Sequence, residues 1–119
     1  EDAEKRIRHV AKNVAETFGA EAQVGIQRGY PVTMNHGDQT DFAIEVATSV
    51  SGRGKVNPDV APVMGGEDFS YMLEARPGAF IFMGNGDSAF LHHPEYDFND
   101  DAIPHGVSYW VALAEKALA

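Results

Sequence analysis

The sequence predicts an α/β class of fold built from two incomplete parts, an open-faced α+β layer and the edge of a larger α/β sheet. Residues 2–18 place apolar side chains at helical spacing, and residues 22–27 then alternate as in a strand with one wet face. Residues 79–83 are five apolar residues without alternation, typical of a strand buried on both faces. This change of pattern predicts a boundary between residues 1–30 and residues 31–119.

The first part is predicted to be one helix followed by one strand. The apolar face of the helix follows the i, i+3, i+4, i+7 rule and contains Ile7, Val10, Ala11, Val14 and Phe18. Gly19 supplies a left-handed stop. A helix and a half-exposed strand fit the closing half of a βαββαβ sandwich, although too few strands are present to complete one.

The second part begins with a linker over residues 30–37 and continues with three predicted helices. The first starts near Asp38 and is expected to bury Phe42, Val46, Ala47 and Val50. A short helix runs through Phe69, Met72 and Leu73. The last covers about 101–118 and is expected to bury Ile103, Val107, Trp110, Val111, Ala114 and Leu118. The long loop over residues 84–100 is of a kind that is often functional.

Composition excludes several classes of function. The chain has 119 residues with 18 acidic and 9 basic side chains, a net charge of −9, so we expect no binding to nucleic acid or membrane surfaces and some affinity for cations. It contains no cysteine, which excludes disulfides and thiolate metal sites and fits a cytoplasmic protein. The chain begins at Glu1 without methionine and opens directly into helical pattern, which is typical of a segment of a longer protein, and equally of a processed N-terminus.

The histidines are the first candidates for chemistry. His9 and His105 stand alone on helices, and no HExxH motif is present. His92 and His93 follow the predicted buried strand, at the end of a sheet where ligands collect. Because adjacent residues of an extended loop point apart, both are not expected to bind one metal. From the residues alone, an ordinary loop histidine remains the favoured alternative.

Two further segments are candidates for binding. Gly65 and Gly66 precede a helix, so backbone N–H groups there are free to attract an anion such as a substrate carboxylate. The alternative is that Glu67 and Asp68 are ordinary first-turn acids. Asn35-His36 lies in the linker, where either a cleft or a simple polar turn explains it. No Gly-x-Ser-x-Gly nucleophile elbow and no phosphate-binding loop is present.

Several blocks of sequence carry a resemblance to a known family. These are Pro62-Val63-Met64-Gly65-Gly66-Glu67-Asp68-Phe69-Ser70, Pro77-Gly78-Ala79, Gly84, and Leu91-His92-His93-Pro94-Glu95-Tyr96-Asp97-Phe98-Asn99-Asp100. In order and spacing they resemble the C-terminal end of peptidase family M20, in its branch of hippurate hydrolases, N-acyl-amino-acid hydrolases and auxin-conjugate hydrolases. The stretch from Tyr30 to His36 is similar to the family's exit from its lid domain.

The resemblance implies a fold and a set of sites. The family combines an α/β catalytic domain that holds two divalent metals (Zn, Mn or Co) with an inserted βαββαβ lid that usually dimerises. Residues 1–30 would then be the end of the lid and residues 31–119 the end of the catalytic domain. The family's last metal ligand maps onto His92, while His93 stands at a variable position. Gly65, Gly66 and Glu67 map onto a turn that borders the substrate site.

The remaining metal ligands and the general-base glutamate of the family lie upstream of Glu1, so no catalytic residue is expected in this chain. We therefore expect the parent protein to hydrolyse the amide bond of N-acyl amino acids, such as hippurate-like substrates, with a metal-activated water. The isolated chain is expected to be inactive. The alternatives are a non-catalytic binding or oligomerisation module with the same scaffold, or an unrelated acidic adaptor. A His/Cys-rich ligand segment and a Glu-Glu pair upstream of Glu1 would distinguish the enzyme from these non-catalytic alternatives.

Overall fold

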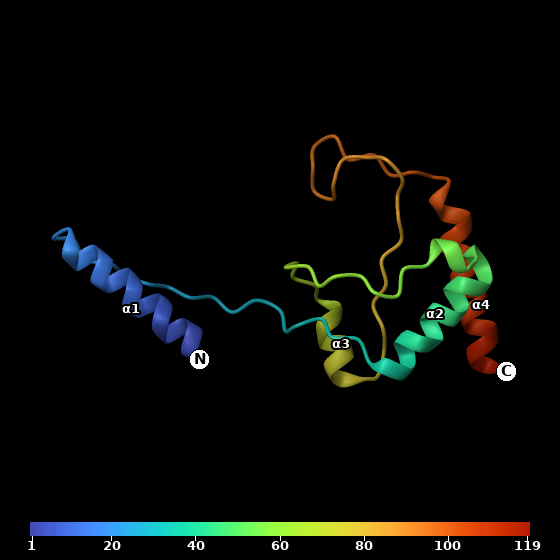
Figure 1. Cartoon of the computed structure of the whole chain (residues 1–119), viewed down its shortest axis with the longest axis horizontal. Helices are drawn as coiled ribbons and strands as arrows, with labels where there is room; N and C mark the ends of the chain where they lie inside the picture. Colours follow the sequence, from blue (N-terminus) through green and yellow to red (C-terminus); the bar gives the residue numbers. More distant parts are fainter.

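The chain forms four α-helices and one 3-10 turn joined by long extended connections, as a computed structural model describes for residues 1–119. The elements are α1 (Asp2–Thr17), α2 (Gly37–Ser51), η1 (Arg53–Lys55), α3 (Phe69–Ala75) and α4 (Ala102–Leu118). α1 lies at one end of the molecule and the other helices lie at the opposite end (Figure 1). The four helices predicted from periodicity are confirmed.

α1 and the segment that follows it form a hairpin of helix and extended chain. Gly19, at φ 70°, turns the chain, and the segment returns along the helix. The Arg8 side chain donates a hydrogen bond to the carbonyl of Val24. Arg28 forms a bidentate ion pair with Glu4, with N–O distances of 3.0 and 3.1 Å. Two arginines thus hold the returning segment against α1.

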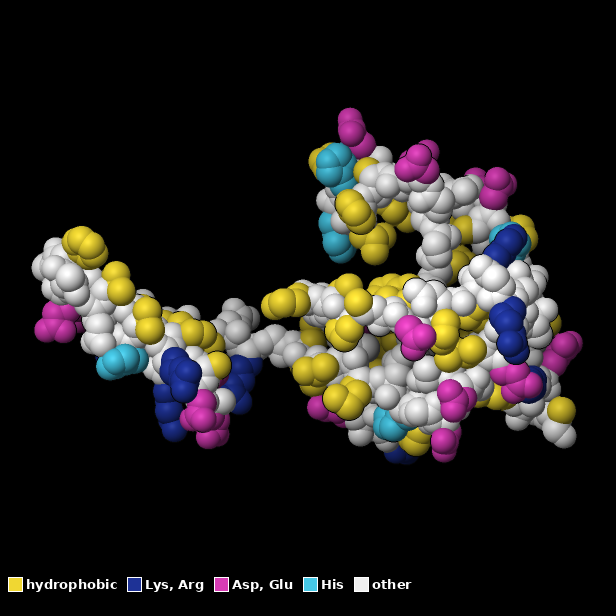
Figure 2. All heavy atoms as spheres, in the orientation of Figure 1, with side chains coloured by type: hydrophobic (Ala, Val, Ile, Leu, Met, Phe, Trp, Pro, Cys, Tyr) yellow, Lys and Arg dark blue, Asp and Glu magenta, His cyan; other side chains and the backbone are white.

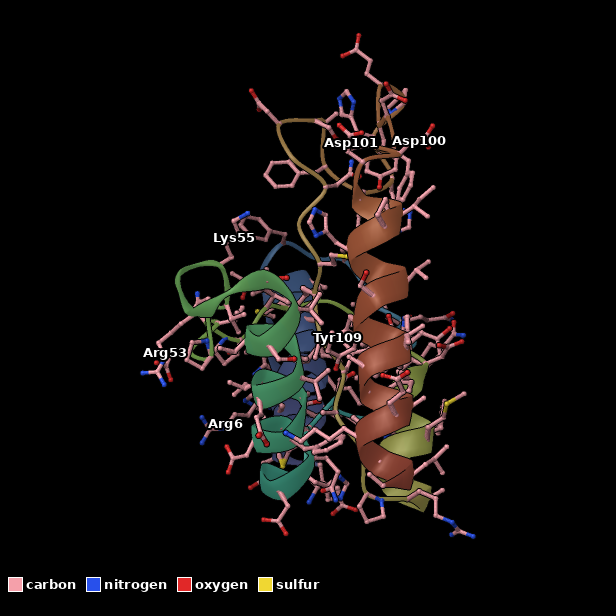
Figure 3. The ribbon with its side chains drawn as sticks, turned by 90° about the vertical axis from the view of Figure 1, so that its right-hand side faces the viewer. Arg6, Arg53, Lys55, Asp100, Asp101 and Tyr109 are labelled. Atoms are coloured by element: carbon pink, nitrogen blue, oxygen red, sulfur yellow. The ribbon has the colours of Figure 1, made fainter.

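α2 and α4 pack side by side and form the main helix pair (Figure 3). α3 adds the buried residues Ser70 and Leu73. Ala43 and Val46 of α2 are buried, and Tyr109 lies on the side of α4 that faces α2. Burial raises the pKa of the Tyr109 hydroxyl. At the far end of the pair, Lys116 forms an ion pair with Glu45 and lies 5.9 Å from the centre of the Phe42 ring.

The prediction of which face of α4 is buried is wrong. The buried residues of α4 are Ala102 and Tyr109, whereas Trp110 is 63% exposed. The other residues expected in the core are also exposed, namely Ile103, Val107, Val111, Ala114 and Leu118. The helix carries apolar side chains on two faces, and α2 covers the face that contains Tyr109. Periodicity alone does not say which of two apolar faces finds a partner.

The predicted α/β fold is also wrong, because the chain contains no β-strand. Residues 22–27 and 79–83, expected as strands, are extended but pair with no other strand. The first segment lies against α1, and the second runs between α3 and the loop that leads to α4. Consequently neither the end of a βαββαβ lid nor the edge of an α/β sheet is formed. Alternation predicts the faces of a strand but not the presence of a partner to pair with it.

The chain exposes far more surface than a compact domain of its size. Its accessible area is 10153 Å², against about 6,300 Å² for a folded monomer of this mass. Its radius of gyration is 20.6 Å, against about 13.5 Å for a compact chain of this length. Apolar side chains lie along one side of α1 and over the helical body (Figure 2). No helix combines the length and apolar character needed to cross a bilayer.

Candidate functional site

His92 lies in the loop that connects residue 84 to α4, at the third position of a tight turn. The amide of His93 donates to the carbonyl of Phe90 at 3.0 Å, which closes the turn. The φ angle of His92 is 68°, the only positive value at a non-glycine residue. This conformation costs roughly 1–2 kcal/mol for an L-residue and is concentrated at functional sites. The structure therefore presents His92 on a strained, exposed turn.

The neighbouring His93 has a role within the loop. Its Nδ1 atom accepts a hydrogen bond from the amide of Glu95 at 3.1 Å, and its carbonyl accepts one from the amide of Tyr96 at 3.0 Å. With Nδ1 engaged as an acceptor, only Nε2 of His93 is left for another partner. The two adjacent histidines are thus different in kind, since no hydrogen bond engages the ring of His92 within the chain.

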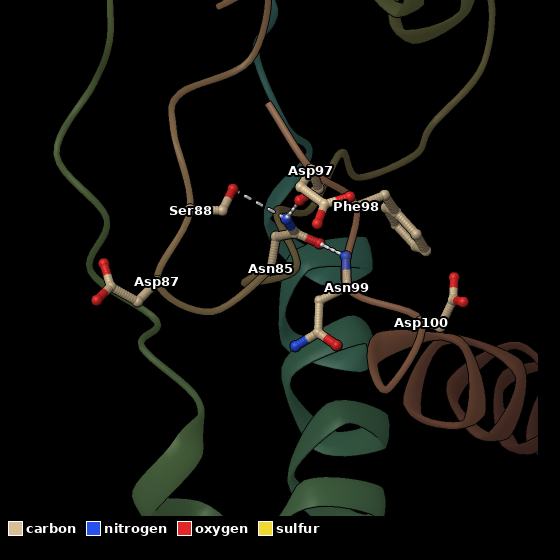
Figure 4. A pocket seen from close by; sticks show the side chains of 7 residues that line it. All are labelled: Asn85, Asp87, Ser88, Asp97, Phe98, Asn99 and Asp100. Atoms are coloured by element: carbon tan, nitrogen blue, oxygen red, sulfur yellow. Dashed lines mark hydrogen bonds between the residues drawn. The ribbon is translucent and has the colours of Figure 1, made fainter. Parts of the chain in front are cut away.

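A shallow polar pocket of about 300 Å³ lies at the base of this loop (Figure 4). Its centre is the side chain of Asn85, and Asp87 and Asp100 point away from it on opposite sides. The residues that line it are Asn85, Asp87, Ser88, Asp97, Phe98, Asn99 and Asp100. Although three of them are carboxylates, they do not converge on one point. Asn85 was not among the predicted site residues; the Asn-Gly dipeptide that it forms with Gly86 signals a turn and was the available clue.

Gly65, Gly66 and Glu67 form the approach to α3. An added Cβ at Gly66 would lie 3.2 Å from the ring of Tyr30, so a larger residue there would displace the tyrosine. The Glu67 carboxylate accepts a hydrogen bond from the amide of Phe69 at 3.2 Å. Glu67 thus takes up an N–H group at the start of α3. The predicted contact of these three residues with substrate stays a prediction.

Asn35 and His36 connect the linker to the segment before the His92 loop. The side-chain amide of Asn35 donates to the carbonyl of Phe80 at 2.8 Å and accepts from its amide at 2.7 Å. The amide of His36 donates to the carbonyl of Gly78 at 3.0 Å. This pair therefore holds residues 78–80 against the start of α2. Both side chains have partners within the chain, as the polar-turn alternative predicts.

The residues of this chain do not by themselves fit a metal ion. It has no group of three or more His, Cys, Asp or Glu side chains placed to hold one. Zinc sites in enzymes use three or four protein ligands. No hydrogen bond joins the His92 loop to the turn at Gly65–Glu67 either. The candidate site residues are therefore separate in the chain, and the metal role of His92 stays a prediction.

Comparison with known proteins decides the family. The model of peptidase family M20/M25/M40 matches residues 3–116. The chain belongs to this family. No solved structure matches the chain. The resemblance noted from the blocks around Gly65 and His92 is confirmed.

Curated members of peptidase family M20/M25/M40 are about one third identical to the chain over the residues that align with it. A hippurate hydrolase of Campylobacter jejuni is 33% identical over 115 residues, which are 97% of this chain and 30% of that protein. An N-acetyldiaminopimelate deacetylase of Streptococcus thermophilus is 34% identical over 108 residues, 88% and 28% of the two chains. An N-acetylcysteine deacetylase of Bacillus subtilis is 31% identical over 110 residues, 92% and 28%. The chain spans less than a third of the length of these relatives.

Proposed function

We propose that the chain is part of an amidohydrolase that cleaves the amide bond of N-acyl amino acids. The family match over residues 3–116 carries this proposal. Hippurate, N-acetyldiaminopimelate and N-acetylcysteine, the compounds that appear in the names of the relatives, are all amino acids with an acylated amino group. The shared chemistry favours an N-acyl amino acid as the substrate class and leaves the acyl group open.

The proposal assigns His92 a single role, that of one ligand to a divalent metal held mainly by residues outside this chain. The exposed ring of His92, which has no hydrogen-bond partner in the chain, supports this assignment. When bound, the metals would supply an activated water. Gly65, Gly66 and Glu67 are proposed to border the substrate. Because this chain has no group of three metal-binding side chains, we propose that it is inactive alone.

The experiment compares the full-length parent protein with its His92→Ala variant. Release of free amino acid from N-benzoylglycine and from N-acetyl amino acids is measured, together with the metal content of both proteins. We expect the variant to lose activity by at least about 100-fold, since even groups that only support a metal ligand are worth 10- to 100-fold. The isolated 119-residue chain, assayed in parallel, should release no amino acid.

His105→Ala is the matched control, because His105 is an exposed histidine within α4, in a regular helix and outside the strained turn. It should keep the activity and metal content of the parent. A His92→Ala protein with unchanged activity and metal content would contradict the role of His92. A parent that hydrolyses none of the N-acyl amino acids would contradict the proposed function itself.

The parent is also proposed to be a homodimer that associates through the region of residues 1–30. The support is the uncovered apolar side of α1, where Ile7, Val10 and Val14 are 54%, 58% and 53% exposed. No residue of α1 is buried in the chain. An apolar stripe of this kind is typical of a helix with a partner.

A further inference from the structure

One side chain, Asn85, joins the two ends of the loop that carries His92. Its Nδ2 atom donates to the carbonyl of Asp97 at 2.8 Å and to the hydroxyl of Ser88 at 3.2 Å. Its Oδ1 atom accepts a hydrogen bond from the amide of Asn99 at 2.8 Å. Figure 4 shows this amide group between the two segments of the loop that it connects. Asn85 therefore bridges 12 to 14 residues of sequence with a single side chain.

No other hydrogen bond crosses the loop. The remaining bonds of residues 86–98 are local, within the turns at Phe90–His93 and His93–Tyr96 and at Ser88–Ala89. No residue of this range is buried and none lies in a helix or strand. The entropy of an open loop of this length opposes a fixed conformation, so the position of the loop depends on the bonds that close it. In this chain those bonds are the ones made by Asn85.

The Asn99 end of the loop is itself fixed to the start of α4. The side chain of Asn99 accepts from the amide of Asp101 at 3.0 Å, and its carbonyl accepts from the amide of Ala102, the buried first residue of α4, at 2.9 Å. At the other end, Gly86 has a φ of 84°, and an added Cβ would lie 3.3 Å from Nδ2 of Asn99. The close approach of the two ends thus requires both Asn85 and glycine at position 86.

We propose that Asn85 is a positioning residue that sets where His92 is presented. It holds the loop closed against the start of α4. The closed loop restricts the positions that the His92 turn can take. This role rests on the proposed function, in which His92 takes part in the site. Displacement of a reacting group by about 1 Å costs on the order of 100-fold in rate, so a loosened loop affects turnover before it affects substrate binding.

The test is Asn85→Ala in the full-length parent protein, with hydrogen exchange and steady-state hydrolysis of N-benzoylglycine measured on the same preparation. We expect faster exchange at the amide of Asn99, which donates to Asn85, and in peptides that cover residues 86–98, with unchanged exchange in α2. We expect kcat to fall about 10- to 100-fold with KM changed less than about 3-fold. A loss of folded protein alone would instead lower kcat only in proportion to the folded fraction, which the melting curve reports.

Two variants accompany it. Asn85→Asp keeps an acceptor for the Asn99 amide and removes both donated bonds, so its loop should exchange faster than that of the parent and its kcat should fall. Asn57→Ala is the matched control, because Asn57 also accepts a backbone amide, that of Asp59 at 3.0 Å, in a turn outside the loop. It should leave kcat and the exchange of residues 86–98 unchanged.

The outcomes separate this inference from the proposed function. If activity depends on His92 but Asn85→Ala loosens the loop without lowering kcat, the positioning role is wrong. If Asn85→Ala leaves the exchange of residues 86–99 unchanged, the inference that Asn85 holds the loop closed is wrong. If His92→Ala keeps the parent's kcat, the proposed function fails for His92, and the role given to Asn85 fails with it.

Discussion

α1 and α4 are amphipathic helices of nearly equal length, 16 and 17 residues, with opposite surroundings. α4 packs on α2 and has two buried residues, Ala102 and Tyr109. α1 buries no residue and is held only to its own extended tail by Arg8 and Arg28. An apolar stripe therefore makes a helix able to pack, but its burial depends on a second element that covers the stripe.

The largest expected effect on stability is the difference between a buried charge in the α2–α4 pair and the same charge on α1. Val46→Asp introduces a carboxylate at a side chain that is 1% exposed, so we expect the free energy of unfolding to fall by on the order of 3 kcal/mol. Val10→Asp places the same charge on α1 at a side chain that is 58% exposed, and a change within about 0.5 kcal/mol is expected. Urea unfolding of the 119-residue chain measures both. Equal losses would remove the distinction between the two regions.

The same Val10→Asp substitution sharpens the comparison in the full-length parent. If α1 has its partner in a second copy, the variant should shift the parent from dimer to monomer in light scattering, although it barely changes the isolated chain. Val107→Asp on α4 is the control, because this side chain is similarly exposed, at 57%. Dimers that persist in Val10→Asp would contradict association through α1.

A smaller effect is expected at the end of the α2–α4 pair. Lys116→Ala removes an exposed ion pair with Glu45 and a contact with the Phe42 ring. Each is worth at most about 1 kcal/mol at an exposed site, so we expect a loss of roughly 1 kcal/mol in the free energy of unfolding. Added salt should reduce the difference between the two proteins, because it screens the ion pair. A loss as large as that of Val46→Asp would mean that the core of the pair is held mainly by charge.

The smallest effect is a pH dependence confined to the α1 hairpin. The hydrogen bond and charge of Arg28 lower the pKa of Glu4 below its ordinary value of 4.5. A carboxylate with a depressed pKa stabilises the folded contact above pH 4.5 and loses that contribution as the pH falls through the lowered value. The NMR chemical shifts of residues 20–28 should therefore move toward unfolded values below pH 4.5, as the Arg28–Glu4 contact that holds this segment is lost. Glu4→Gln should remove this dependence, and its persistence would assign it to another group.

The sequence predicts the helices well, because the backbone hydrogen bonds of a helix lie within one segment of the chain. The bounds of α1 and α2 follow from the spacing of Val10, Val14, Phe42 and Val46 and from the glycines at 19 and 52. Strands require a partner elsewhere in the chain, and the alternation at Val24 and Ile26 carries no information about one. For the same reason, the apolar face of α4 was assigned to the wrong side, with Trp110 inside and Tyr109 left out.

The residues of the candidate site also fall into those that the sequence predicts and those that only the structure shows. His92 was singled out by the blocks that surround it, whereas its positive φ angle is visible only in the structure. Asn85 was missed because its partners are 12 and 14 residues away, beyond the reach of any local pattern. The roles of Asn35 and His36 depend on Phe80 and Gly78, which lie more than 40 residues along the chain. Sequence reasoning thus finds residue types suited to chemistry but not the distant bonds that place them.

The open backbone of residues 22–27 has a practical consequence for anyone who produces the chain alone. Apart from the carbonyl of Val24, which accepts from Arg8, this segment has no hydrogen bond to the rest of the chain. Unpaired N–H and C=O groups beside apolar side chains such as Val24 and Ile26 are a template on which another copy can add. Self-assembly into fibrils or precipitates is therefore the expected hazard of the isolated chain, and a proline at Gly25 is a direct way to suppress it.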